Sequence, residues 1–162
     1  MKPKAQEGEK LIASNPARGD YFIEEVVEAG IVLTGTEVKS LRSQSPNLRD
    51  AFVEIHGKPR IEAYLLHVHV APYSHGNIWN HLPERKRKLL LHRHQIDKLF
   101  GAIIQKGCTI IPLRMYFKEG RVKVELGVGK GKKKHDKRQD IKKKSAQKEI
   151  DQVMKKTRRS DD

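Results

Sequence analysis

The 162-residue sequence predicts a mainly β fold: a small closed β-barrel with two to three helices and a basic C-terminal tail. Short runs of alternating apolar residues recur between turn signals, a pattern typical of strands. The sequence has no repeated strand–helix–strand units of the kind that build parallel sheets. The roughly 125 residues before the tail are enough to bury a substantial core.

We expect three parts along the chain. Residues 1–14 are polar and predict a flexible N-terminus, residues 15–131 form the barrel, and residues 132–162 form the basic tail. In the tail, Ala146, Ile150, Val153 and Thr157 make one sparse apolar stripe at helical spacing. Such a stripe is too weak to hold a helix in water, so we expect disorder in the free protein and a helix against a partner.

The first half of the barrel reads as strands around one short helix. Residues 21–27 predict a strand that breaks at 28–30 and resumes at 31–33. Thr36 is the predicted N-cap of a helix that ends between residues 43 and 46, with Val38 and Leu41 three apart. Residues 51–55 and 60–65 flank a His-Gly-Lys-Pro turn and predict a hairpin.

The second half begins with a loop over residues 74–83. Trp79 lies in this loop, and covering the core is a more common use of such a residue than stacking on a base. Apolar residues from Ile96 to Ile104 at helical spacing predict a helix that Gly107 closes. Residues 109–117 and 121–126 predict a second hairpin. Among small barrels, the OB type fits the size and a single-stranded or looped RNA ligand.

The charge of the chain points to a polyanionic partner. The formal net charge is +14, and residues 127–162 carry 14 Lys and Arg against 6 Asp and Glu. Nucleic acid is the first expectation and an acidic membrane surface the second. A charge run alone is also typical of a solvated linker or a solubility tail. The glycines and lysines of residues 127–138 would let the backbone approach a bulky ligand and supply charge for phosphate.

The sequence predicts a cytoplasmic protein that is a monomer when free. It has no apolar run near the roughly 20 residues that span a bilayer. Its N-terminus lacks the apolar segment of a signal peptide. Cys108 is the single cysteine, which agrees with a reducing compartment, and we expect it to be a small core residue.

Neither a metal site nor a catalytic site is expected, and no cofactor. Histidines occur in alternating pairs and in the 74–83 loop, but zinc needs three or four converging ligands, and no cysteine pair supports them. Four glutamates could be imagined as a metal-dependent nuclease site, although no nucleotide-binding or hydrolase motif accompanies them. These glutamates are Glu24, Glu25, Glu28 and Glu37. We therefore expect a protein that is not an enzyme.

A second basic block, residues 85–88, runs directly into three leucines. A cluster fixed at the junction between a loop and the core gives a defined anion site, which favours RNA binding over solubility alone. If the barrel is right, this block, the polar face of the 121–126 strand and the glycine–lysine stretch form one surface.

Several motifs in one register resemble the SsrA-binding protein (SmpB) family. They are Glu28-Ala-Gly-Ile, Gly35-Thr-Glu-Val-Lys-Ser-Leu-Arg42, Pro72-Tyr73, Arg85-Lys-Arg-Lys-Leu-Leu-Leu91 and Gly131-Lys-Lys-Lys-His-Asp-Lys-Arg138, within residues 15–138. The resemblance implies an OB-type barrel that binds the tRNA-like domain of transfer-messenger RNA and delivers it to stalled bacterial ribosomes for rescue and peptide tagging. It also implies contact with ribosomal RNA of the decoding centre, and with elongation factor Tu through the aminoacylated RNA.

The resemblance, together with the basic blocks, gives the predicted RNA-contacting residues. They are Asn15, Arg18, Glu28, Lys39, Arg42, Arg85, Arg87, Lys88, Leu90, Lys123, Lys130, Lys132 and Lys133. The resemblance further implies a tail that mimics part of a tRNA and enters the decoding centre and the mRNA channel, becoming helical on the ribosome. Its predicted ribosome-engaging residues are His135, Asp136, Lys137, Arg138, Ile150, Val153 and Met154.

Three points stay open at the level of sequence. From spacing alone, Leu90 fits a buried core leucine nearly as well as an RNA contact. Gly19 stands where the family usually has a histidine or aromatic residue, so the side chain that could stack is absent at this position. A generic binder of single-stranded nucleic acid is the alternative function, although aromatic residues, its usual stacking platforms, make up only 6% of the chain.

Overall fold

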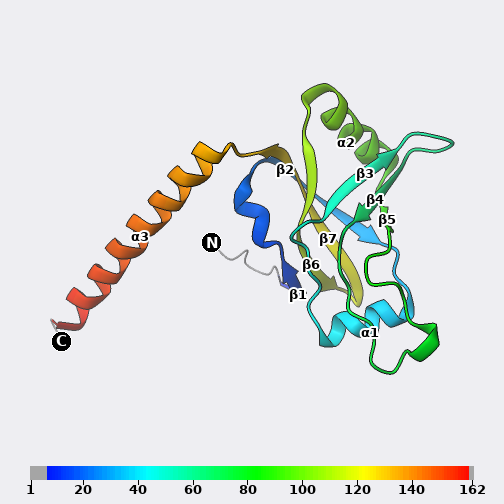
Figure 1. Ribbon diagram of the computed structural model, residues 1–162, viewed down its shortest axis with the longest axis horizontal. Coiled ribbons are helices and arrows are strands. Elements are labelled where there is room, and N and C mark those ends of the chain that lie inside the picture. The colour runs from blue at the N-terminus through cyan, green and yellow to red at the C-terminus, as the bar shows by residue number, and fades with distance from the viewer. Residues whose placement is uncertain (1–6, 161–162) are drawn as a thin grey trace. The chain divides into compact units, whose positions relative to one another are not determined.

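The computed structural model describes residues 7–160 as a mainly antiparallel sheet with three α-helices (Figure 1). The strands are β1 (Glu9–Ser14), β2 (Tyr21–Ile31), β3 (Phe52–His56), β4 (Glu62–Leu66), β5 (Arg87–Leu90), β6 (Thr109–Lys118) and β7 (Arg121–Gly131). The helices are α1 (Gly35–Ser43), α2 (Arg93–Lys106) and α3 (Lys134–Ser160), with short 3₁₀ helices η1 (Pro16–Asp20) and η2 (Asn77–Trp79). The predicted mainly β class is confirmed.

The described strands follow the order β1-β6-β7-β2-β5-β4-β3 in one sheet. β1 and β3 are its two edges, so the closed barrel is not confirmed. β3 and β6 nevertheless contact each other, because the sheet curls around a shared core. Both predicted hairpins are confirmed: β3 pairs with β4, and β6 pairs with β7.

The concave side of the sheet holds the hydrophobic core. Leu65, Val68, Met115 and Leu126 are fully buried there, and Cys108 is buried as the sequence predicts. α2 packs its Leu99 into this core and ends at Gly107, whose φ of 63° lies in the left-handed region that glycine tolerates best. The predicted helix and its stop are therefore confirmed.

Two local predictions are wrong in detail. β2 runs without a break to Ile31, and Gly30 lies inside it, directly opposite Leu90 on β5. The N-cap of α1 is Thr34 rather than Thr36: Thr34 has extended backbone, and its N–H donates to Glu37 Oε2 at 2.9 Å. This link from the third helical residue back to the cap is the sequence signature of a capping box, two positions earlier than predicted.

The N-terminal segment is not flexible throughout. Glu9–Ser14 forms β1, which pairs with the edge of β6, and Glu9 makes an ion pair with Arg114 at 2.8 Å. The polar composition of this segment hid the strand, because an edge strand needs few apolar residues when backbone pairing and charge hold it. Residues 1–6 of the predicted flexible segment lie outside the described residues.

β7 extends to Gly131, beyond the predicted end at residue 126. A Cβ atom on Gly129 would lie 2.0 Å from the carbonyl oxygen of Phe22, and one on Gly127 would lie 2.8 Å from Leu113 Cδ2. These two glycines therefore admit neighbouring parts of the protein itself, not a bulky ligand. The sequence pattern showed the close approach but not its partner.

The chain divides into two compact units, Met1–Lys130 and Gly131–Asp162. In the second unit, Lys132 makes an ion pair with Asp140, and Lys134–Ser160 is helical. Disorder of the free tail stays a prediction. Residues 161–162 lie outside the described part of the chain, and none of the helices in residues 7–160 is long and apolar enough to cross a membrane.

Candidate RNA-binding surface

A shallow depression of about 750 Å³ opens where β2, β5 and β7 meet the start of α2. It brings together three residues from the predicted RNA-contacting set: Glu28 from β2, Leu90 from β5 and Lys123 from β7. These residues are far apart in the sequence, so only the sheet order makes them neighbours. The other lining residues are Glu25, Val26, Val27, Gly30, Leu91, His92, His94, Gln95, Lys98 and Leu99.

Strand alternation aims these side chains outward. On β5, Leu89 is buried in the core, whereas the next residue, Leu90, is 55% exposed. The ambiguity at Leu90 is thereby removed, because this leucine is not a core residue. On β7, Lys123 lies between the buried Val122 and Val124 and so faces the opposite side.

Glu28 supplies an ionised hydrogen-bond acceptor at this surface. Its Oε2 accepts a hydrogen bond from the hydroxyl of Tyr116 and lies 3.2 Å from Lys118 Nζ. The hydrogen bond from Tyr116, aided by Lys118 and Lys123, lowers the pKa of Glu28. Burial and the adjacent Glu28 carboxylate raise the pKa of Tyr116, so its hydroxyl stays a donor. A carboxylate held in this way can accept from a base N–H or a ribose 2′-hydroxyl.

Behind Glu28, a chain of contacts runs along the same face of β6. The guanidinium of Arg114 lies 4.4 Å from the centre of the Tyr116 ring and pairs with Glu9 and Glu125. Sequence reasoning missed Tyr116 and Arg114. The alternation of Arg114, Tyr116 and Lys118 along the strand was the available signal, but their partners come from β1, β2 and β7.

The floor and rim of the depression offer other kinds of contact. Val26 and Leu90 expose apolar surface suited to a base or a ribose. At the rim, His92 and His94 stack with ring centroids 5.7 Å apart, and Lys98 Nζ donates to Glu25 at 2.6 Å. An apolar patch, a hydrogen-bond acceptor and cations together suit the bases, sugars and phosphates of a folded RNA loop.

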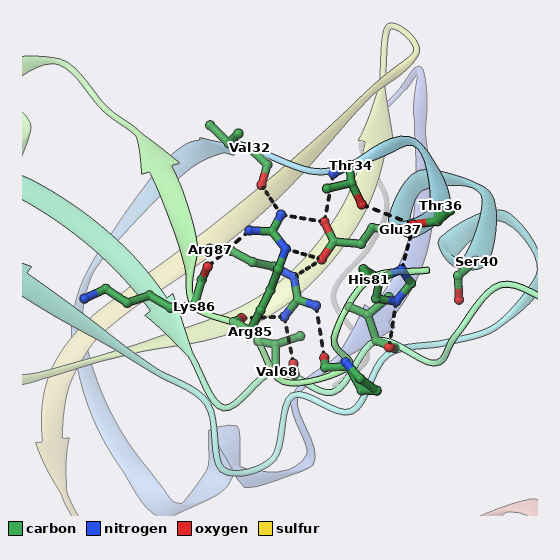
Figure 2. A network of polar contacts seen from close by, with 12 residues as sticks. Val32, Thr34, Thr36, Glu37, Ser40, Val68, His81, Arg85, Lys86 and Arg87 are labelled. Atoms are coloured by element: carbon green, nitrogen blue, oxygen red, sulfur yellow. Dashed lines mark hydrogen bonds and ion pairs between the residues drawn. The ribbon is translucent and has the colours of Figure 1, made fainter. Parts of the chain in front are cut away.

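Arg87 does not belong to this surface, and its predicted RNA contact is wrong. Its side chain is completely buried, with Nε donating to Glu37 Oε1 at 2.8 Å (Figure 2). The remaining donors reach the carbonyl oxygens of Val68 at 2.9 Å, Pro83 at 3.0 Å and Arg85 at 3.0 Å. Because alternation along β5 places Arg87 on the core side, its charge pairs with Glu37 inside the protein.

Arg85 joins the same buried cluster. Its Nε and Nη2 donate to the two oxygens of Glu37 at 2.8 and 2.7 Å, as Figure 2 shows. Burial alone would raise the pKa of Glu37, but the hydrogen bonds from Arg85 and the Thr34 N–H, with the charge of Arg87, lower it. Through Arg85 and Arg87, Glu37 thus ties α1 to the segment that enters β5, and Lys86 and Lys88 are the exposed residues of the basic block.

The outward lysines of this block have local partners. Lys88 Nζ donates to Glu62 at 2.8 Å, and Lys86 Nζ lies 4.3 Å from the centre of the Tyr64 ring. Lys88 is therefore exposed, but away from the depression, on the side of β4.

Asn15 is also committed to the fold. It is buried: its Nδ2 donates to the Pro112 carbonyl at 2.8 Å, and its Oδ1 accepts from the Ala17 N–H at 2.9 Å. This geometry caps η1, and because Asn15 is only 4% exposed, its amide has little surface left to face RNA. Arg18, three residues on, is exposed.

The remaining predicted residues lie outside the depression. Lys39 and Arg42 are exposed on α1, and Lys130 is exposed at the end of the first unit. Lys132, Lys133 and residues 135–138 belong to the second unit, as do the exposed Ile150, Val153 and Met154 on α3. Among the described residues, no group of three His, Cys, Asp or Glu could hold a metal ion.

Comparison with known proteins decides the family. The family model described as SmpB protein matches residues 12–156. The chain belongs to the SmpB family. An SsrA-binding protein of Pelobacter propionicus is 56% identical over 149 residues, covering 91% of this chain and 96% of the relative. An SsrA-binding protein of Acetivibrio thermocellus is 51% identical over 152 residues, covering 93% and 97%.

A solved structure supports the same assignment. One chain of a structure described as "tmRNA-SmpB: a journey to the center of the bacterial ribosome" matches with a TM-score of 0.62 and 46% sequence identity. The match covers 75% of this chain and 85% of that chain. The family resemblance seen in the sequence motifs is therefore confirmed.

Proposed function

We propose that this chain is the RNA-binding adaptor of trans-translation, which binds transfer-messenger RNA and brings it to stalled bacterial ribosomes. The observation that carries the proposal is the match to the SmpB family over residues 12–156. The depression adds a physical reason, since it gathers Glu28, Leu90 and Lys123 on one exposed face.

In this proposal the depression holds the tRNA-like domain of the RNA. Lys123 neutralises phosphate, Glu28 accepts from a base or ribose donor, and Leu90 with Val26 packs against an unstacked base or sugar. No covalent step is required of any of these groups, so the protein acts by binding and not as an enzyme. Arg18 and the exposed Lys130 extend the contact to phosphates further along the RNA.

The second unit serves the ribosome. The basic residues at its start and the exposed apolar residues of α3 suit a segment that enters the decoding centre and the mRNA channel. Elongation factor Tu joins through the aminoacylated RNA. The expected setting is the cytoplasm, with the free protein a monomer and no role at a membrane.

The test compares two RNAs and two lengths of the protein. The full chain should bind the isolated tRNA-like RNA far more tightly than an unstructured RNA of equal length, with log affinity falling linearly with log salt. Truncation after Lys134 should keep that affinity and abolish tagging of stalled peptides in a translation extract. Equal affinity for the two RNAs would instead indicate a generic single-strand binder.

A further inference from the structure

The loop before β5 exposes three large apolar side chains within five residues. Ile78 is 86% exposed, Trp79 is 83% exposed and Leu82 is 75% exposed. The prediction that Trp79 covers the core is therefore wrong. Trp79 is also the only tryptophan of the chain. Several large apolar side chains exposed within one loop indicate an interaction site more strongly than single exposed residues do.

Hydrogen bonds hold the loop that exposes these side chains. Asn80 holds both sides of it, since its Nδ2 donates to the Tyr73 carbonyl at 2.7 Å and its Oδ1 accepts from the Tyr73 N–H at 3.0 Å. The next residue, His81, is buried between Thr36 Oγ1 at 2.9 Å and the Val70 carbonyl at 3.0 Å (Figure 2). The backbone on both sides of Trp79 is thus held in place while its side chain stays exposed. A side chain held in this way is pre-organised for binding, because little conformational freedom is lost when a partner binds.

The loop lies apart from the depression. Its bond to Thr36 ties it to α1, and Figure 1 shows α1 and α2 at opposite ends of the sheet, with the green loop beside α1. None of the described residues that line the depression comes from residues 72–83. A ligand in the depression therefore leaves the loop available to a second partner.

The charges around the loop favour RNA as that partner. Residues 72–83 contain no carboxylate, and the next acid along the chain, Glu84, lies 3.6 Å from His69. On the adjoining helix, Lys39 Nζ lies 5.5 Å from the centre of the Tyr73 ring, and Arg42 is exposed one turn further on. A loop with an exposed indole and no carboxylate, bonded to a helix with exposed cations, carries the groups that stack on an unpaired base and bind its phosphates.

We propose that residues 72–83 form a second RNA-contacting surface, on which Trp79 stacks on an unpaired base of ribosomal RNA and Lys39 and Arg42 bind the flanking phosphates. The proposal rests on the proposed function, because that function assigns the depression to the transfer-messenger RNA and makes the ribosome the other RNA partner. Ile78 and Leu82 then shield the stacked base from water.

The experiment replaces Trp79 in the full chain and measures binding to purified stalled ribosomes by pelleting. A single stacked base corresponds to about five- to 150-fold in affinity, and we expect Trp79→Ala to weaken ribosome binding about tenfold. Trp79→Phe should keep most of the affinity, whereas Trp79→Leu, which is apolar but cannot stack, should lose it. Affinity for the isolated tRNA-like RNA should stay within twofold of the wild type in all three.

Two further measurements make the outcomes distinct. Quenching of Trp79 fluorescence by a short single-stranded RNA reports stacking directly, and Ile104→Ala on α2 is the control for loss of an exposed apolar side chain. Wild-type ribosome affinity in Trp79→Leu would overturn the proposal in favour of apolar contact with a protein. Unchanged affinity in Trp79→Ala, or a Trp79-dependent dimer in sedimentation, would also overturn it. Loss of tRNA-like RNA binding by the wild type would instead refute the proposed function.

Discussion

Glu37 and Glu28 are both held by cations and hydrogen-bond donors, but their roles differ. Glu37 stabilises the fold, whereas Glu28 presents a hydrogen-bond acceptor at the surface. Glu37 is completely buried and accepts from Arg85, Arg87 and a backbone N–H. Glu28 is partly exposed; it accepts a hydrogen bond from the Tyr116 hydroxyl and makes an ion pair with Lys118. The pKa is lowered for both. What separates them is how much of each carboxylate still faces water.

The comparison shows that a basic motif cannot be assigned to RNA from charge alone. Arg87 and Lys88 are adjacent, yet one closes a buried ion-pair cluster and the other lies on the surface. Alternation along β5 decides between these roles. The Glu37 cluster fixes the scaffold, and the Glu28 cluster presents an acceptor on that scaffold.

The largest effect is expected where the buried cluster is broken. Arg87→Met should lower the free energy of unfolding by about 3–5 kcal/mol, because it removes the buried charged partner of Glu37 and one donor from each of three carbonyl oxygens. Urea unfolding followed by circular dichroism measures this loss. Lys88→Met, one residue along, is the matched control and should leave the unfolding midpoint nearly unchanged. Equal losses in the two variants would contradict the distinction between them.

The second effect separates binding from stability. Glu28→Gln should weaken binding to the tRNA-like RNA about tenfold, since a hydrogen bond to a charged acceptor is replaced by a neutral one. The thermal midpoint should change little, because Glu28 is partly exposed. Filter binding and differential scanning fluorimetry on the same preparation give both values. A large fall in stability with unchanged affinity would reverse the roles of the two glutamates.

A smaller effect is expected from the residue behind Glu28. Tyr116→Phe removes one hydroxyl, so affinity should fall about two- to fivefold and stability by about 1 kcal/mol. The pKa of Glu28 should rise without this donor, so that RNA binding is lost at a higher pH on acidification than in the wild type. Tyr64→Phe is the control, because the Tyr64 hydroxyl bonds only the remote Glu62. An identical pH profile for Tyr116→Phe and the wild type would exclude this positioning role.

The smallest effect concerns acid stability. The folded state holds the pKa of Glu37 below its ordinary value of 4.5, so the unfolded chain takes up a proton at higher pH than the folded one. The contribution of ionised Glu37 to the free energy of unfolding is therefore fully present above pH 4.5. It declines as the pH falls toward the pKa of Glu37 in the folded state. Stability of Glu37→Gln, measured between pH 6 and roughly pH 3, should vary less with pH than that of the wild type. A steeper dependence would contradict the assignment.

The sequence predicted elements whose signals are local. The two hairpins and α2, which Gly107 closes, follow from apolar periodicity and turn residues. β1 was missed because an edge strand with charged residues has no such period, and β5 because a buried arginine broke its alternation. Helix α1 was predicted, but its cap was displaced by two residues because Thr34 and Thr36 are both acceptable caps.

By itself, the sequence determined the class of fold, the polyanionic partner and, through motifs spread over most of the chain, the family. Only the tertiary structure decided which charged side chains face outward. It buried Arg87 and Asn15, exposed Leu90 and Trp79, and joined Glu28 to Tyr116 across the sheet. Residue order records what lies next along a strand, whereas burial and partners depend on which strands become neighbours.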